Sequence, residues 1–382
     1  MLILTTECAK NRERIEMKIV TILLKYDYGI KGRGESLEKK VFLPAIQLNC
    51  DEVVPFWIEE NGFYENRKEL QKNIIDFVVK ENPAIVFFIL MYDEVTPDTI
   101  KKISENCITI NWFADDQWRF ADFTKYIAPL FHYSITMDKY SLIKYKDLGC
   151  KSILSQWAAL DYVKNMNLDN VNYMYDISFI GGKNINREWI IYELKNAGYY
   201  VECFGDGWGR GRIDFEEMKN IFYSSKINLN LSNSTPNDIR LVGFARRKLI
   251  YDTLCNIKKI SLKNPVRYLK NIIKPLIQFL NIKKSTKKVE QIKARNFEIP
   301  GFGGFQLSQY ALEIEDYYVI GKEIAVFSTL EELKKQIDYY LQNEIERKSI
   351  VKAGYDRTKE YTYEKRFRKI FEEVNKCEML VL

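Results

Sequence analysis

An arginine and a glutamate lie one helical turn apart in the stretch QIKARNFEIPGFGGFQLSQY, residues 291–310. Arg295 and Glu298 come near the end of a helix-like run, and a proline, a burst of glycines and a short apolar strand follow directly. A guanidinium can bind an anion and a carboxylate can accept hydrogen bonds from hydroxyl groups. The elements around the pair therefore decide which ligand the two charges could hold.

Strand-like and helix-like segments alternate along both halves of the chain. In the first half, strands are predicted at 18–26, 84–90, 109–113 and 132–136, with a helix over 66–83. In the second half, strands are predicted at 176–182, 200–208, 225–231, 303–308 and 324–328, with helices over 186–198 and most of 329–374. This alternation is typical of parallel sheets covered by helices. We therefore expect two α/β domains, residues 1–165 and 166–382, with a cleft between them.

The composition is that of a folded protein with reduced thiols. At 382 residues, with 46% hydrophobic and 14% aromatic residues, the chain can bury two full cores. Its seven cysteines include no C-x-x-C pair, which favours buried thiols in a cytoplasmic protein over a disulfide framework or a zinc site. We see no signal-peptide core and no membrane span. A cytoplasmic location is expected.

Missing motifs exclude several classes of enzyme. The chain lacks the G-x-G-x-x-G of dinucleotide-binding enzymes, the G-x-x-x-x-G-K-[ST] phosphate loop and the G-x-S-x-G of serine hydrolases. Its single histidine rules out a histidine-rich metal site, and without an Asp-x-Asp pair a metal-bound sugar nucleotide is not expected. What remains is a two-domain α/β protein whose ligands would bind at the carboxyl ends of its strands.

Several segments, taken together in their order and spacing, resemble one family. They are 26–42, 82–103, 110–123 and 152–160 in the first half, and 176–208, 225–231, 294–307 and 362–367 in the second. The chain resembles the CgeB-like glycosyltransferases, which are placed among the family 1 and family 4-like enzymes of GT-B fold. The likeness spans nearly the whole chain. It implies two Rossmann-like domains facing each other across a cleft, with the donor bound by the second domain and the acceptor by the first.

The resemblance gives Glu298 and Arg295 roles at a donor site. In such enzymes a glutamate before a strand holds the nucleotide ribose, and Glu298 occupies that place; a carboxylate accepts two hydrogen bonds from a vicinal diol. Arg295, a forked donor near a helix N-terminus, suits the diphosphate. Related enzymes place a second glutamate earlier, at a position that we align with Gln291, beside Glu290. The structural alternative for Glu298 is an ordinary glutamate at a helix end.

Glycines at two strand ends are expected to form the other wall of this site. Gly181 and Gly182 let the backbone approach a phosphate, while Lys183 and Arg187 neutralise the leaving phosphate. The turn with Gly205 and Trp208 would border the base. A glycine turn followed by a charged helix start is the structural alternative for the first four residues, and a tight turn alone is the alternative for residues 204–208.

Acidic residues after a strand mark the candidate acceptor side of the first domain. Asp115 and Asp116 follow the strand at 109–113, and one of them could act as general base or orient the acceptor hydroxyl. The glycine-rich loop at 29–36, with Gly34 and Glu35, is expected to border the acceptor. A mobile surface loop is the alternative for that segment.

One basic segment dominates the charge of the chain. Residues 256–295 hold twelve Lys and Arg against one acid, so the net charge of +6 arises from +11 there and −5 elsewhere. A helix is predicted over 264–280, with a lysine and arginine stripe beside an apolar face. The insertion, 256–293, could be an interfacial membrane helix or could pack its apolar face on the protein. Nucleic acid is not expected as a partner.

We therefore expect a metal-independent glycosyltransferase that moves a sugar from a nucleotide-diphosphate sugar, a UDP-sugar above all, to an acceptor hydroxyl. The acceptor could be a surface glycan, a lipid-linked glycan or a protein, and no further cofactor is expected. Two alternatives stay open: another nucleotide-sugar enzyme of the same fold, such as an epimerase, and a non-catalytic two-lobed binding protein for sugars or nucleotides.

Overall fold

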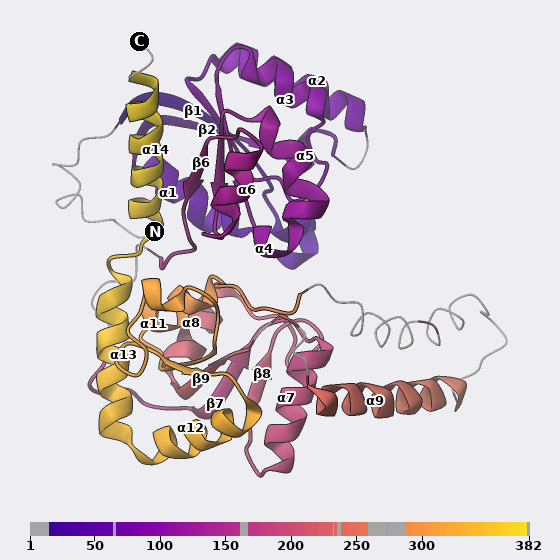
Figure 1. The fold of residues 1–382 in the computed structure, drawn as a ribbon, viewed down its shortest axis with the longest axis vertical. Coiled ribbons are helices and arrows are strands. Elements are labelled where there is room, and N and C mark those ends of the chain that lie inside the picture. Colours follow the sequence, from indigo (N-terminus) through magenta and orange to yellow (C-terminus); the bar gives the residue numbers. More distant parts are fainter. Residues whose placement is uncertain are drawn as a thin grey trace. The chain divides into compact units, whose positions relative to one another are not determined.

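The computed structural model describes residues 15–63, 66–160, 167–231, 233–234, 238–258, 273 and 287–379. The chain divides into two units, Met1–Asp161 with Tyr361–Leu382, and Tyr162–Glu360. Each unit contains its own parallel sheet covered by helices (Figure 1). The prediction of two parallel-sheet α/β domains is confirmed.

The described part of the first unit is built on a six-stranded parallel sheet in the order β2-β1-β3-β4-β5-β6. Its strands are β1 (Ile15–Leu23), β2 (Cys50–Trp57), β3 (Ile85–Phe88), β4 (Ile108–Phe113), β5 (Tyr133–Thr136) and β6 (Ser152–Leu154). All residues of β3 and β5 are buried, as expected for parallel strands covered on both faces. The covering helices include α1 (Leu43–Gln47), α2 (Arg67–Glu81), α3 (Pro97–Ser104), α4 (Asp116–Arg119), α5 (Lys125–Ile127) and α6 (Ser141–Asp147).

The helix predicted over 66–83 forms as α2 because its sequence carries both a start signal and an apolar face. The side chain of Asn66 accepts a hydrogen bond from the amide of Glu69, which caps the helix. Leu70, Ile74 and Val78, spaced four residues apart, are buried against the sheet. The helix ends at Asn82, which takes a left-handed conformation.

Strand β2 was missed by the sequence analysis. Its sequence, CDEVVPFW, contains two acids and a proline, and these read as a loop. Among the described strands it lies at the edge of the sheet and pairs with β1 alone, with Pro55 opposite Thr21. An edge strand tolerates a proline because only one side of its backbone must form ladder hydrogen bonds.

The last helix returns to the first unit, which corrects the prediction that all C-terminal helices belong to the second domain. Helix α14 (Tyr363–Met379) lies beside α1 and the first sheet (Figure 1). The Asn49 side chain donates to the carbonyl of Glu364, and the rings of Phe42 and Phe367 lie 5.6 Å apart. Long-range packing of aromatic residues, which no local pattern encodes, assigns this helix to its unit.

The described part of the second unit contains a five-stranded parallel sheet in the order β11-β10-β9-β7-β8. The strands are β7 (Tyr175–Ile180), β8 (Glu202–Phe204), β9 (Ser225–Asn230), β10 (Gln306–Gln309) and β11 (Ala325–Phe327). The helices are α7 (Ile185–Asn196), α8 (Phe215–Tyr223), α9 (Ile239–Lys258), α11 (Arg295–Gly301), α12 (Leu330–Gln342) and α13 (Glu344–Thr358). Strands β7, β9 and β10 are adjacent, so their carboxyl ends meet at one edge of the sheet.

A glycine in α13 lets this helix pack closely against the segment that carries Glu298. A β-carbon at Gly354 would lie 2.3 Å from the carbonyl oxygen of Glu323 and 3.3 Å from Cβ of Pro300, in α11. The close approach of α13 to the Glu323 carbonyl therefore requires a residue without a side chain at this position, and the same residue lets Pro300 of α11 lie against α13.

Gly354→Ala should lower the free energy of unfolding by about 1–3 kcal/mol, because the added methyl group must displace backbone in a packed contact. Gly209→Ala is the matched control, since a β-carbon there meets nothing within 4 Å. Urea denaturation followed by circular dichroism measures both variants. Equal stability of Gly354→Ala and the wild-type protein would contradict the packing described for α13.

Candidate functional site

Two glycine turns touch at the carboxyl ends of β7 and β8. The amide of Gly181 donates to the carbonyl of Phe204 at 2.9 Å, and the indole Nε1 of Trp208 donates to the carbonyl of Gly181 at 2.8 Å. Gly205 has a φ of +121°, and a β-carbon there would lie 2.4 Å from the Gly181 oxygen. Only glycine fits at 205. The structure thus brings together Gly181, Gly182, Gly205 and Trp208, as the sequence analysis expected.

Arg187 is tied to the ends of two strands. It belongs to the first turn of α7, which Asn184 caps by accepting from the Arg187 amide. Its guanidinium donates to the carbonyl of Leu231, through Nε at 3.2 Å and Nη2 at 2.9 Å, and to the carbonyl of Gly182 at 2.8 Å. Burial lowers the pKa of Arg187 to about 10, so the side chain keeps its charge at neutral pH.

Arg187 and Arg295 line one pocket of the second unit, together with Glu290 and Lys293. The two guanidinium groups are close enough that the charge of Arg295 contributes to the lowered pKa of Arg187. The rest of the lining is mostly polar and includes Asn230, Asn233, Asn296 and Ser308. Three cations and one carboxylate give this pocket a net positive charge, which suits an anionic ligand.

Glu298 is buried behind the pocket rather than on its wall. Its side chain is 4% exposed and forms an ion pair with Nη1 of Arg295. Nε of Arg295 is buried and has no hydrogen-bond partner among the residues that the structure describes. Glu298 therefore holds the guanidinium at the pocket. The predicted ribose contact of Glu298 stays a prediction.

The Lys183 side chain lies apart from the pocket of Arg187 and Arg295. Its ammonium forms an ion pair with Glu188 at 3.1 Å and lies 5.2 Å from the centre of the Trp208 ring. It is not among the residues that line the pocket with Arg187 and Arg295. The described structure thus brings only two of the three predicted phosphate-binding cations together at this pocket.

The second glutamate of the related enzymes corresponds to Glu290 in this chain, and the alignment with Gln291 given above is wrong. Seven residues separate Glu290 from Glu298. The Glu290 carboxylate accepts backbone hydrogen bonds from Asn233 at 2.7 Å and from Gln291 at 3.0 Å. Burial, partly offset by Lys293 and these amides, raises the pKa of Glu290. This spacing and the buried carboxylate near Arg187 identify Glu290 as the second acidic residue.

The two aspartates of the first unit have different environments. Asp116 is 2% exposed and accepts from the hydroxyls of Thr124 at 2.7 Å, Thr136 at 2.6 Å and Tyr145 at 2.7 Å. A buried carboxylate that accepts from three hydroxyl donors stabilises the interior of the unit. Asp116 is therefore a structural residue and not an available base. Asp115 is half-buried at the end of β4, with a φ of +65°. Such a backbone conformation is uncommon for a residue other than glycine, although aspartate takes it more readily than most, and it concentrates at functional sites.

The predicted loop with Gly34 and Glu35 closes on itself after β1. The amide of Asp27 donates to the carbonyl of Gly34 at 3.0 Å, and Gly34 has a φ of +83°. Glu35 forms an ion pair with Lys39, and this contact lowers the pKa of the Glu35 carboxyl. The loop is thus a hydrogen-bonded turn at the carboxyl end of β1, and Glu35 lies on its surface.

Glu38 is a candidate functional residue that the sequence analysis missed. It begins a π-helical turn, Glu38–Phe42, and such turns occur often at functional sites. Burial, together with the charges of Asp27 and Glu59, raises the pKa of Glu38 to about 7. In the sequence it stands before two lysines and reads as a surface residue. The burial that changes its chemistry follows only from the tertiary fold.

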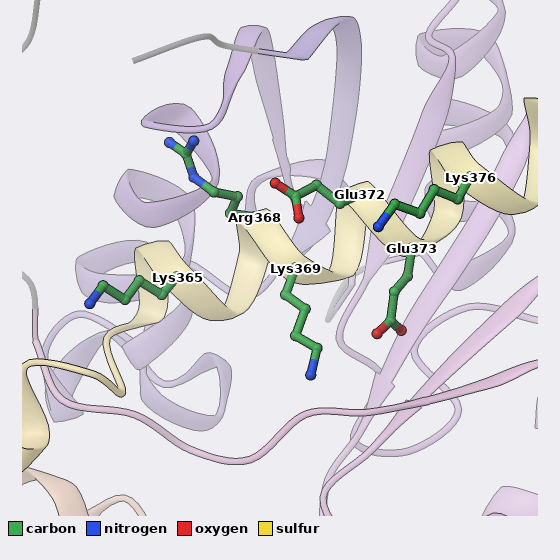
Figure 2. Close-up of a pocket in the computed structure, with 6 residues that line it drawn as sticks. All are labelled: Lys365, Arg368, Lys369, Glu372, Glu373 and Lys376. Carbon is green, nitrogen blue, oxygen red and sulfur yellow. The ribbon is translucent and has the colours of Figure 1, made fainter. Parts of the chain in front are cut away.

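A hollow along α14 is a weaker candidate. It is lined by six charged residues of that helix: Lys365, Arg368, Lys369, Glu372, Glu373 and Lys376. Figure 2 shows that these side chains leave the helix in different directions and do not converge on one point. Mixed charges along an exposed helix face stabilise the helix and keep it in water, so we assign no ligand to this hollow.

The helix predicted over 264–280 and most of the insertion at 256–293 lie outside the described residues. Of the preceding helix, α9, the structure shows that it extends outward past α7 (Figure 1). Over the ranges that the structure describes, no helix has the length and apolar character needed to span a bilayer.

Comparison with known proteins supports the fold. Residues 262–372 match a family model described as glycosyl transferase-like, whereas a search of curated proteins finds no match. A glycosyltransferase from Rickettsia africae ESF-5 is similar in structure, with a TM-score of 0.54 and 10% identity over 94% of this chain and 98% of that one. A sucrose-phosphate synthase from Thermosynechococcus elongatus gives a TM-score of 0.56 and 8% identity over 95% and 99%.

At such low identity these likenesses show the fold alone. The chain has the GT-B fold, and its residues 262–372 match a glycosyl transferase-like domain. The finer resemblance to the CgeB-like group stays a prediction.

Glu38→Gln should change how stability depends on pH. The folded protein keeps the Glu38 proton up to a pKa of about 7, whereas the unfolded chain releases it near the ordinary pKa of about 4.3. Between these values the folded state binds more protons, so this carboxyl lowers the free energy of unfolding as the pH rises. Urea denaturation at pH 5 and pH 8 should show a smaller decrease in the variant, by roughly 1–3 kcal/mol. The same decrease in both proteins would show that Glu38 titrates normally.

Proposed function

We propose that the chain is a glycosyltransferase whose second unit binds a nucleotide-diphosphate sugar. The observation that carries this proposal is the pocket where Arg187 and Arg295 meet beside Glu290. A guanidinium donates two parallel hydrogen bonds to phosphate oxygens, and two such groups at one pocket match a diphosphate. The glycosyl transferase-like match over residues 262–372, which includes Arg295, supports the same assignment.

In the proposed reaction, the bond between the sugar anomeric carbon and the diphosphate breaks, and a bond to the acceptor oxygen forms. The nucleoside diphosphate leaves with the bonding electrons, and one of its oxygens accepts the proton of the acceptor hydroxyl. Arg187, Arg295 and Lys293 stabilise the negative charge that develops on the leaving group. Positive side chains take the place that a divalent cation has in other sugar transferases, so we propose that transfer needs no metal. UDP is the expected nucleotide.

The residues of the site have separate roles in this proposal. Arg187 is held by backbone carbonyls and provides a fixed charge. Arg295 is held by Glu298 and provides the second. Glu290, whose carboxylate is oriented by backbone amides, lies where it can accept hydrogen bonds from sugar hydroxyls. We place the acceptor at the first unit, with Asp115 orienting its hydroxyl.

Arg295→Ala should raise the KM for the donor and lower kcat about 10²-fold or more, because a donor to the leaving diphosphate is lost. A thermal-shift screen of UDP-, GDP-, ADP- and dTDP-sugars first identifies the donor, and release of the nucleoside diphosphate then reports turnover, with and without EDTA. Arg295→Lys, which keeps the charge but loses the fork, should be intermediate.

Arg210→Ala is the matched control for this assay. Arg210 belongs to the same unit, pairs with Glu202 and does not line the pocket. Unchanged turnover and donor binding in Arg295→Ala would contradict the assignment. Consumption of the donor by epimerisation, with no acceptor present, would favour the alternative enzyme of the same fold.

We propose that the region around α9 also contacts a membrane that contains anionic lipids. Ile250, Tyr251 and Leu254 are more than half exposed on one side of α9, and Arg246 and Arg247 are exposed nearby. The segment that follows, 256–295, carries a net charge of +11. An exposed apolar face beside many positive charges is typical of helices that lie at a membrane surface.

Reversing the charges of Arg246 and Arg247 to Glu should reduce binding to vesicles of phosphatidylglycerol and phosphatidylcholine at least tenfold, since each basic residue near an anionic surface contributes about 1 kcal/mol. Co-sedimentation measures the binding. Lys195→Glu with Lys335→Glu makes the same charge change elsewhere on the second unit. Equal binding of both double variants, or no binding by the wild-type protein, would contradict the contact.

A further inference from the structure

Two exposed tyrosines stand at the carboxyl ends of neighbouring strands in the first unit. Tyr28 follows β1 and is 58% exposed, and Tyr92 follows β3 and is 61% exposed. Because β1 and β3 are paired and parallel, both loops emerge from the same edge of the sheet. The pKa of Tyr28 is raised by partial burial and further by Asp27, Asp115 and Tyr92. Asp115 follows β4, which pairs in parallel with β3, so its loop emerges at the same edge of the sheet as the two tyrosines.

Tyr28 is fixed in a backbone conformation that a tyrosine seldom takes. Its φ is +52° and its ψ is +29°, which costs a bulky residue about 1 kcal/mol. Hydrogen bonds on either side hold it there, from the amide of Gly29 to the carbonyl of Tyr26 at 2.8 Å, and from Ser36 to the carbonyl of Leu24 at 2.6 Å. The Arg33 guanidinium lies 5.4 Å from the centre of the ring. A strained backbone conformation that neighbouring contacts maintain, at a residue with an exposed ring, indicates a functional position.

Tyr92 is held just as firmly. The Glu94 carboxylate, itself 3% exposed, accepts from the Tyr92 amide at 2.7 Å. Two residues earlier, the amide of Leu90 donates to the buried side chain of Asn111 at 3.1 Å. The Arg119 guanidinium lies 5.0 Å from the centre of the Tyr92 ring and donates to the carbonyl of Met91. The ring is therefore placed before any ligand arrives, which lowers the entropy cost of binding.

We propose that Tyr28 and Tyr92 form a platform that binds a sugar ring of the acceptor, beside Asp115. This inference rests on the proposed transferase function and deepens it, because it makes the acceptor a glycan. The face of a pyranose carries C–H groups that pack on an aromatic ring, while its hydroxyls need polar partners at the edge. Tyrosine supplies a rigid apolar face and a polar tip, and the Asp115 carboxylate accepts from hydroxyls.

The charges around the platform favour a neutral glycan over a phosphate-bearing ligand. Asp27 and Asp93 stand on the same loops as the two tyrosines, and Asp115 stands on the loop after β4. Arg33 lies over the Tyr28 ring, Arg119 lies over the Tyr92 ring, and Arg67 pairs with Asp93 at 3.2 Å. The three aspartates and three arginines balance in charge, so they give no net attraction for a nucleic acid or an anionic lipid. An uncharged polyhydroxylated ring needs no such attraction.

Saturation-transfer NMR on the full chain tests the platform with maltose, cellobiose and lactose as probes. We expect at least one disaccharide to receive saturation through its ring protons. Tyr28→Ala and Tyr92→Ala should each weaken that binding at least fivefold, whereas Tyr28→Phe and Tyr92→Phe should keep most of it because the ring remains. Tyr126→Ala is the matched control, since Tyr126 is 63% exposed in the same unit and has Lys125 4.8 Å from its ring centre.

Two results would overturn the proposal. The first is that none of the three disaccharides binds at about 50 mM, a concentration well above a dissociation constant on the order of 1 mM. The second is equal binding by the alanine variants and the wild-type protein. Loss of binding to anionic vesicles in the tyrosine variants would instead assign the platform to a membrane. The test uses no nucleotide, so its outcome is separate from that of the donor assay. If disaccharides bind but no nucleotide sugar shifts the melting temperature or is consumed, the platform is supported and the transferase function is contradicted.

Discussion

The guanidinium of Arg187 connects the carboxyl ends of two strands in the second unit. It donates to the carbonyl of Gly182, after β7, and to that of Leu231, after β9. This link joins the turn with Gly181 and Gly182 to the end of β9. The same side chain also brings a positive charge to Glu290 and Arg295. One buried cation thus shapes the backbone and supplies charge to the site, which a lysine could not do with the same fork of donors.

Close backbone contacts make this arrangement rigid. Gly205 lies against the Gly181 carbonyl with no room for a side chain, and Gly354 does the same for α13 against Glu323. Trp208 closes the turn through its indole hydrogen bond to Gly181. Gly205 and Gly354 each allow a backbone contact that any side chain would prevent.

In the first unit, the candidate functional groups are exposed side chains on loops. Its interior is fixed by bonds such as those of Asp116 with Thr124, Thr136 and Tyr145. Upon this interior, the loops after β1, β3 and β4 hold Tyr28, Tyr92 and Asp115 in constrained conformations. A surface built in this way suits a large polar ligand that is held by stacking and hydrogen bonds, whereas the second unit suits a compact anion.

The sequence by itself determined the two parallel-sheet units, because runs such as residues 84–90 and 176–182 and the capped helix α2 carry their structure in local pattern. Through the resemblance to a glycosyltransferase family, it also pointed to Arg187, Arg295, Gly181 and Gly205. Tertiary structure decided what local pattern does not encode. Edge strand β2 forms because β1 offers it a partner, and α14 joins the first unit through Phe42 and Phe367. Burial by distant segments made Asp116 structural, raised the pKa of Glu38 to about 7 and placed Glu290 at the pocket. The physical reason is that local order depends on neighbours in the chain, whereas desolvation and charge pairing depend on neighbours in space.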